Sequence, residues 1–254
     1  MRDFIFFLFN LTCLFSYFCL WSFVFFLLFY FEKFPFHDSH IRFKNNIIDI
    51  WFDSLFMFAY DVKHTPKGAF RESGIVIYEG PQGSGKTVSM IHDVMILQHK
   101  YPKLKVIDNL NYIYSDREMD HPNDLIDFTN GVFGVCSAID ECGIWFNNRN
   151  FKDFGKESNM LQVIFENRKV RRLLLGTTQK FSLIDKNLRL QVSEVRSAYT
   201  VGSFFTFYVR KIPNVDSEGT IQNYRFKGIK FFVHTKDLRD AYDTYHVITK
   251  FKPV

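Results

Sequence analysis

The sequence predicts an α/β fold with a mostly parallel five-stranded core sheet between helices, an antiparallel C-terminal extension and one N-terminal transmembrane helix. Three observations lead to this prediction. A glycine-rich, phosphate-binding motif stands between an apolar strand and a helical stretch. A later apolar run closes on two adjacent carboxylates. The N-terminal run carries no charged side chain and is long enough to cross a bilayer.

The N-terminal run extends from Phe4 to Phe31. As a helix it would be about 42 Å long, more than the roughly 30 Å of a bilayer's hydrocarbon core. A cleaved signal peptide is the alternative, but its apolar region is shorter and ends in small residues, whereas this run ends in Phe31-Glu32-Lys33. More basic residues follow the run than precede it, which favours a cytoplasmic location for the C-terminal side.

The phosphate-binding motif fits the pattern Gly-x4-Gly-Lys-Ser/Thr without substitution. It consists of Gly80, Pro81, Gln82, Gly83, Ser84, Gly85, Lys86 and Thr87. The glycines let backbone N–H groups turn inward around an anion, and the helix that follows adds its positive dipole end. Lys86 is predicted to reach the phosphates of ATP and Thr87 to bind Mg²⁺. A solvated turn is the alternative, but a strand over 75–78 and a helix over 88–100 flank the motif as phosphate binding requires.

These patterns divide the chain into three parts. Residues 1–33 are the predicted transmembrane anchor, residues 34–72 a juxtamembrane segment, and residues 73–254 a P-loop ATPase domain. The juxtamembrane segment is apolar-rich but too short and too charged to cross a bilayer. It is expected either to lie at the membrane interface or to pack on the domain as an extra helix.

A second core strand is expected over 104–109, and a third, over 132–139, closes on Asp140 and Glu141. In a parallel sheet the carboxyl ends of the strands line the ligand site. Asp140 is therefore predicted to hold Mg²⁺ and Glu141 to polarise the attacking water. An acidic pair after an apolar run is often only a strand-end turn, but behind a phosphate loop it indicates hydrolysis.

The fourth predicted strand, 173–179, ends in Gln179, which is expected to sense the γ-phosphate or the attacking water, the alternative being a strand cap. A basic cluster over 168–172 precedes it. The cluster has three readings: a solvated helix end, a DNA-backbone contact, or an arginine finger for a neighbouring subunit. Arg168 and Arg171 are the predicted fingers, with Arg149 and Arg189 as further candidates.

The C-terminal part carries a fifth core strand over 192–200 and alternating segments over 204–212, 224–226 and 230–234. The alternation predicts an antiparallel hairpin or meander at the sheet edge, followed by a short helix over 236–242. The four cysteines lack zinc-ligand spacing and are expected to be reduced. The net charge of +5 permits contact with nucleic acid or anionic lipid without requiring either.

The motifs together resemble the Zot family, the assembly ATPases of filamentous phages in the FtsK–HerA group. The resemblance covers residues 74–244, and the segments that carry it are 80–87, Asn109, 139–141 with Trp145-Phe146, 178–179 with 183–189, and Tyr242-Asp243-Thr244. It implies a five-stranded core, oligomeric rings and ATP-driven extrusion of single-stranded phage DNA as coat subunits are added. This chain departs from the family's usual order, in which the membrane span follows the ATPase domain.

The expected function is thus a membrane-anchored ATPase that couples ATP hydrolysis to phage DNA extrusion and virion assembly. Expected partners are single-stranded phage DNA, the lipid bilayer, further copies in a homo-oligomeric ring, and coat or envelope-pore proteins. The expected location is the host inner membrane, with the ATPase domain in the cytoplasm. Two alternatives stay open: a genome-packaging ATPase of an icosahedral virus, and a nucleotide-binding membrane scaffold with little turnover. A small-molecule kinase is disfavoured because no lid-like insertion is found.

Overall fold

The computed structural model describes residues 2–31, 46–120, 124–145 and 168–242. Its contacts divide the chain into two units, Met1–Lys67 and Gly68–Val254, each described here by itself. The first unit holds α1 (Arg2–Tyr30) and α2 (Ile47–His64). The elements of the second are β1 (Gly74–Glu79), α3 (Lys86–Lys100), β2 (Lys105–Asp108), β3 (Arg117–Glu118), α4 (Asp124–Asp127), η1 (Gly131–Phe133), β4 (Val135–Ile139), α5 (Cys142–Trp145), β5 (Arg172–Thr178), η2 (Phe181–Leu183), α8 (Lys186–Arg189), β6 (Val192–Val201), β7 (Phe205–Val215), β8 (Ile221–Val233) and α9 (Lys236–Asp240).

The two helices of the first unit pack through aromatic side chains. Phe25 meets Phe52 edge to face with ring centroids 4.8 Å apart, and Trp51 Nε1 donates a hydrogen bond to Ser22 Oγ. Phe29 is only 6% exposed. Part of the aromatic surface of α1 that was expected to face lipid is thus used against a second helix.

Among the described residues, no helix combines the length and the apolar character that crossing a membrane requires. The predicted transmembrane helix within residues 1–33 is therefore wrong. The predicted single-pass location in the host inner membrane, which depended on that helix, is wrong for the same reason. The three-part division at residues 33 and 72 stays a prediction.

The second unit is built on one eight-stranded sheet in the order β3-β2-β4-β5-β1-β6-β7-β8. The pairings from β3 to β6 are parallel, and β7 and β8 continue the sheet in antiparallel fashion. The prediction of five strands is wrong because β3 adds a parallel strand and because the C-terminal extension belongs to the same sheet. Both residues of β3 are exposed, so no apolar alternation marks this strand in the sequence.

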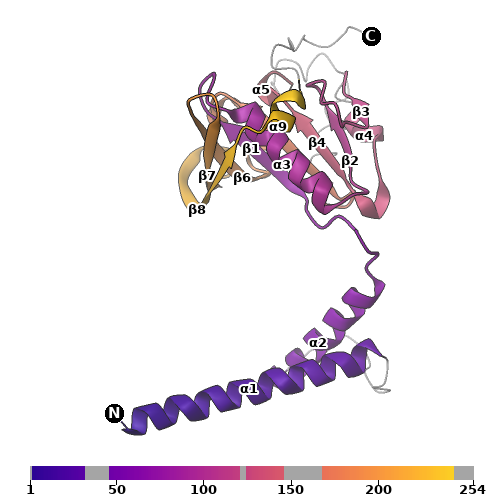
Figure 1. The fold of residues 1–254 in the computed structure, drawn as a ribbon, viewed down its shortest axis with the longest axis vertical. Helices are drawn as coiled ribbons and strands as arrows, with labels where there is room; N and C mark the ends of the chain where they lie inside the picture. The colour runs from indigo at the N-terminus through magenta and orange to yellow at the C-terminus, as the bar shows by residue number, and fades with distance from the viewer. Residues whose placement is uncertain (1, 32–45, 121–123, 146–167, 243–254) are drawn as a thin grey trace. The chain divides into compact units, whose positions relative to one another are not determined.

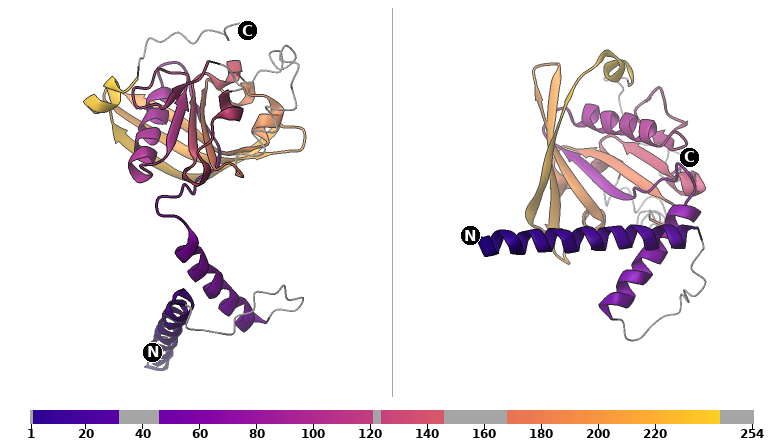
Figure 2. Two further views of the ribbon diagram at one scale, coloured as in Figure 1. Left: turned by 90° about the vertical axis from the view of Figure 1, so that its right-hand side faces the viewer. Right: turned by 60° about the horizontal axis from the view of Figure 1, so that its bottom comes forward.

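The parallel part of the sheet is covered on both faces, which is why its central strands read as continuous apolar runs. On one face α3 and α9 pack over a core that includes Val76, Tyr78 and Leu238. On the other face the short elements α4, α5, η2 and α8 cover a second core that includes Ile75 and Ile77. Figure 2 shows these layers from two further directions.

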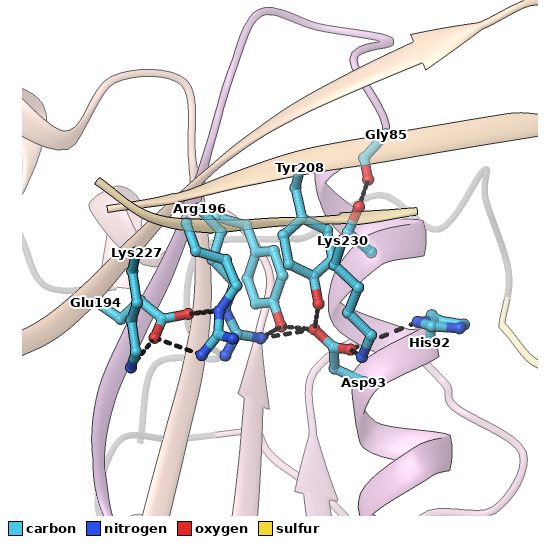
Figure 3. A network of polar contacts seen from close by, with 11 residues as sticks. Gly85, His92, Asp93, Glu194, Arg196, Tyr208, Lys227 and Lys230 are labelled. Atoms are coloured by element: carbon cyan, nitrogen blue, oxygen red, sulfur yellow. Dashed lines mark hydrogen bonds and ion pairs between the residues drawn. The ribbon is translucent and has the colours of Figure 1, made fainter. Parts of the chain in front are cut away.

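A buried carboxylate, Asp93, ties α3 to the sheet (Figure 3). It accepts hydrogen bonds from Tyr78 Oη at 2.7 Å and Tyr208 Oη at 2.5 Å, and it pairs with Arg196 and Lys230 at 2.6 Å. Burial alone would raise its pKa, but the neighbouring His92 and the two cations outweigh burial and hold the pKa well below its ordinary value. Asp93 is therefore charged and fully partnered at neutral pH.

Glu194 on β6 continues this network. Its carboxylate pairs with Arg196 at 2.6 Å, Arg210 at 2.8 Å and Lys227 at 2.6 Å. Burial acts to raise its pKa, but the hydrogen bond from Arg210 and the other two cations lower the pKa to about 2. Arg196 bridges the two acids, so the network links α3 to β1, β6, β7 and β8.

We predict that Asp93→Asn lowers the free energy of unfolding by about 3 kcal/mol, because it removes the counter-charge of Lys230 and one of the two carboxylates that neutralise the largely buried Arg196. Urea denaturation measures this change. Asp240→Asn, at an exposed position on α9, is the matched control and should change the stability by less than about 0.5 kcal/mol. Equal stability of the two variants would show that the network does not stabilise the fold.

A second prediction concerns acid stability. Because the pKa of Glu194 falls from 4.5 to about 2 on folding, its ionisation stabilises the fold above pH 4.5. That contribution is lost as the pH falls toward 2. Glu194→Gln should therefore flatten the decline in unfolding free energy within this window, whereas the exposed Glu118→Gln should keep the wild-type slope. An unchanged slope in Glu194→Gln would contradict the assignment.

Candidate active site

The loop between β1 and α3 has the backbone shape that its glycines allow. Gly83 and Gly85 have φ of 77° and 89°, in the left-handed region that L side chains rarely adopt. Ser84 N donates to the Pro81 carbonyl over 3.2 Å and closes the loop. Lys86 is 7% exposed, and its Nζ donates to the same carbonyl at 3.0 Å. The ammonium group is thus folded back into the loop, where phosphate oxygens would replace the carbonyl.

Two threonines on the strands that flank the β6–β7 turn pack against Gly85 of the loop. Hydroxyls of Thr200 and Thr206 lie 2.6 Å apart, and Thr206 Oγ1 is 2.7 Å from His234 Nε2. A Cβ on Gly85 would collide with Thr200 Oγ1 and would lie 2.9 Å from Thr206 Oγ1. Only glycine therefore fits this close approach at the first turn of α3.

Asp140 follows β4 and points at the start of α3. Its Oδ1 accepts hydrogen bonds from Thr87 Oγ1 at 2.9 Å and from Thr177 Oγ1 at 2.5 Å. Its backbone is held by Asn109, which accepts from Asp140 N at 2.8 Å and donates to Asp140 O at 3.2 Å. The structure thus brings together Thr87 and Asp140, the two residues predicted to bind Mg²⁺.

Glu141 sits beside Asp140 in a strained backbone conformation. Its φ is 47°, and its N–H donates to Thr177 Oγ1 at 2.9 Å. Burial and the charge of Asp140 raise the pKa of Glu141, while the charge of Lys86 acts against them. A non-glycine residue with positive φ carries strain that functional sites often hold. Glu141 also lies within electrostatic reach of the phosphate-loop lysine.

Thr177 is the residue whose role the sequence did not reveal. The apolar pattern placed it at a polar strand end, without indicating that one hydroxyl would hold both acids. Glu79 was also missed: it ends β1 and accepts hydrogen bonds from Ser197 Oγ at 2.8 Å and Phe181 N at 3.3 Å. The signal available for both was a polar residue at the carboxyl end of a buried parallel strand.

The remaining predicted site residues lie at different ends of β5. Gln179 is exposed just beyond the last residue of β5, at the same sheet edge as Asp140. Arg168 is exposed before the first residue of β5, at the opposite edge, and Arg171 there donates to the Val132 carbonyl at 3.2 Å. Arg189 ends α8, and Arg149 lies outside the described residues. The roles of Gln179 and Arg168 stay predictions.

The oxygens around Asp140 suit a hard divalent cation. Thr87 Oγ1 and Asp140 Oδ1 are hydroxyl and carboxylate oxygens, which Mg²⁺ prefers. Within the described part of the chain, no group of three or more His, Cys, Asp or Glu side chains forms a metal site of its own. Thr87 and Asp140 would therefore hold such an ion together with phosphate oxygens and water, so the donor set fits a nucleotide-bound Mg²⁺.

Gly83 and Gly85 differ in the space around them, so alanine at the two positions should have different effects. Both have positive φ, but a Cβ on Gly83 meets nothing within 4 Å. Gly83→Ala should therefore cost only backbone strain of about 1–2 kcal/mol, whereas Gly85→Ala should also displace the threonine pair and weaken ATP binding at least about tenfold more. Thermal unfolding and titration with a fluorescent ATP analogue measure both effects. Equal binding by the two variants would show that the close approach at Gly85 is unimportant.

No protein-family model and no curated protein sequence matches this chain. The N-terminal domain of zonular occludens toxin (Zot) from Neisseria meningitidis is 16% identical, with a TM-score of 0.44 over 68% of this chain and 100% of that one. The genome packaging NTPase B204 from Sulfolobus turreted icosahedral virus 2, in complex with ATP-gammaS, is 14% identical, with a TM-score of 0.39 over 60% of this chain and 96% of that one. The VirB11 ATPase from the Brucella suis type IV secretion system is 11% identical, with a TM-score of 0.31 over 82% of this chain and 60% of that one.

Zot and a viral packaging NTPase are thus among the solved structures to which this chain is similar. Placement in the FtsK–HerA branch stays a prediction.

Proposed function

We propose that this protein is an ATPase that uses ATP hydrolysis to move viral DNA during virion assembly. The observation that carries the hydrolytic part is the contact of Thr87 with Asp140, 2.9 Å across the start of α3, with Lys86 folded into the adjacent loop. Three strand ends and one helix start converge on this point. Such convergence at the carboxyl edge of a parallel sheet is where nucleotides bind.

Each residue has a role that its geometry supports. The loop amides and Lys86 would bind the phosphates of ATP, and Thr87 with Asp140 would hold Mg²⁺, which supplies charge neutralisation at the phosphates. Glu141 would accept a proton from the attacking water, and the hydroxyl of Thr177 positions both acids. Gln179, exposed at the same edge, is assigned to the phosphate or the water. Arg168 is assigned to a neighbouring subunit because it lies at the opposite edge of its own sheet.

The DNA step is supported by the motif resemblance to the Zot family, and the net charge of +5 is compatible with a polyanionic substrate. Within this proposal the substrate is single-stranded phage DNA, the working form is a homo-oligomeric ring, and coat or envelope-pore proteins are the further partners.

The hydrolytic assignment predicts different behaviour for two site variants. Glu141→Gln should retain ATP binding and lose at least about 100-fold in kcat, because the base is removed while the phosphate contacts stay. Lys86→Ala should weaken binding itself at least about tenfold, because a charge-assisted contact to phosphate is lost. Glu118→Gln, an exposed glutamate on β3, is the control. Hydrolysis by Glu141→Gln at the wild-type rate would show that another group activates water.

The DNA step is tested by measuring ATP hydrolysis by the full chain with no DNA, with single-stranded DNA and with double-stranded DNA. We expect single-stranded DNA to raise kcat severalfold in the wild type and to leave Glu141→Gln inactive. Stimulation by double-stranded DNA alone would favour genome packaging. Slow turnover that no DNA changes would instead indicate a nucleotide-binding scaffold.

A further inference from the structure

The antiparallel part of the sheet has one buried face and one exposed face. On β7 and β8, side chains that point toward α3 are buried, such as Tyr208 at 1% and Phe232 at 7% exposure. The alternating apolar side chains on the other face are exposed on β8 and at the end of β6, and partly exposed on β7. This outer face is formed by Tyr199, Val201, Phe207, Phe226, Phe231 and Val233.

The outer face is a continuous apolar surface rather than scattered side chains. Tyr199 stacks on Phe207 with ring centroids 5.2 Å apart, and Phe207 lies 6.0 Å from Phe231 across the next strand pair. Phe226 and Phe231 are 64% and 61% exposed. Soluble monomers rarely leave aromatic patches of this kind uncovered.

The size of the outer face matches one side of a protein–protein interface. A half-exposed aromatic side chain contributes roughly 100 Å² and a half-exposed valine less, so the six residues, of which Phe207 is only partly exposed, present roughly 500 Å². A standard interface removes about 800 Å² from each partner. The patch therefore provides most of the area that a stable pair of proteins needs.

The cations of β7 and β8 near this face already have partners. Lys211, opposite Phe226, lies on the outer face, where its Nζ donates to Ser197 Oγ at 2.8 Å and lies 3.9 Å from Glu79. Lys227 and Lys230 on β8 bind Glu194 and Asp93 on the α3 side of the sheet. A nucleic acid would need cations for its phosphates, whereas apolar and aromatic side chains dominate the outer face and its Lys211 is engaged with Ser197 and Glu79. The composition of the outer face therefore fits a protein partner rather than DNA.

The backbone of β8 points to the same kind of partner. β8 is the last strand in the sheet order, and it runs for 13 residues with no described strand on its other side. A long edge strand next to an apolar face is a template for association with another chain. Lysines on edge strands normally oppose such pairing, but here Lys227 and Lys230 are held by the buried acids.

The outer face also reaches the candidate active site. Val201 ends β6 directly after Thr200, whose hydroxyl lies against Gly85 of the phosphate loop. A chain docked on this face would touch the turn that supports the loop, so docking and nucleotide binding would influence one another.

We propose that a second copy of this chain docks on the outer face of β6–β8. This inference deepens the proposed function, since it assigns a surface to the contact between copies in the assembly that the function requires. Because the same face adjoins the phosphate loop, docking sets the position of the β6–β7 turn beneath Gly85.

Light scattering after size exclusion tests the proposal on the full chain, whose mass is 30.2 kDa. The wild type should show a multiple of this mass, and the double variant Phe226→Ser with Phe231→Ser should dissociate at least 100-fold more readily. Ile113→Ser, at a 59% exposed apolar residue outside β6–β8, is the matched control and should keep the wild-type mass. A wild type of single-chain mass at every concentration, with or without ATP, would assign the face to another protein and overturn the proposal. So would a double variant that keeps the wild-type mass.

Hydrogen–deuterium exchange on the wild type provides a local readout that needs no folded variant. Amide protection along β8 should rise with protein concentration, while protection along β2 should not change. Concentration-independent exchange along β8 would overturn the proposal. Neither measurement requires hydrolysis, so failure of the docking proposal is distinguishable from failure of the ATPase assignment, which the Glu141→Gln variant tests.

Discussion

The hydrogen bonds that converge on the Asp140 carboxylate are the interaction on which the candidate active site depends. Thr87 comes from the first turn of α3 and Thr177 from the end of β5, and both donate to the same oxygen. Asn109, just after β2, fixes the backbone of Asp140 from the other side. Through its carboxylate and its backbone together, Asp140 thereby sets the relative positions of three strand ends and the phosphate-binding helix, and a nucleotide bound there would meet ligands that are already oriented.

The same helix is held at a second point two turns further along. Asp93 binds tyrosine and cationic side chains from β1, β6, β7 and β8, so the antiparallel strands are coupled to α3 (Figure 3). Nearer the loop, Gly85 packs against the threonines of the β6–β7 turn. The C-terminal strands therefore buttress the nucleotide site rather than forming a separate appendage, which explains why they share one sheet with the parallel core.

The sequence predicted those features that short-range patterns encode. The glycine spacing located the phosphate loop, and buried apolar runs located β1, β2, β4, β5 and β6. The coupling of Asp93 to Arg196 and Lys230 was beyond reach, because the partners are more than 100 residues away and a lone acid on a helix normally indicates a solvated position. The apolar content of the N-terminal run led to the prediction of a membrane-spanning helix, which the described helices do not bear out. Composition also could not show that α1 packs its aromatic rings against α2.

The most direct test of the central claim is a crystal structure of the protein with Mg²⁺ and a non-hydrolysable ATP analogue. We expect Lys86 Nζ to leave the Pro81 carbonyl, 3.0 Å away in the present structure, and to bind the phosphates, with Asp140 and Glu141 facing the γ-phosphate. A nucleotide bound elsewhere, or a bound nucleotide with Lys86 still on Pro81 and the two acids turned away, would contradict it.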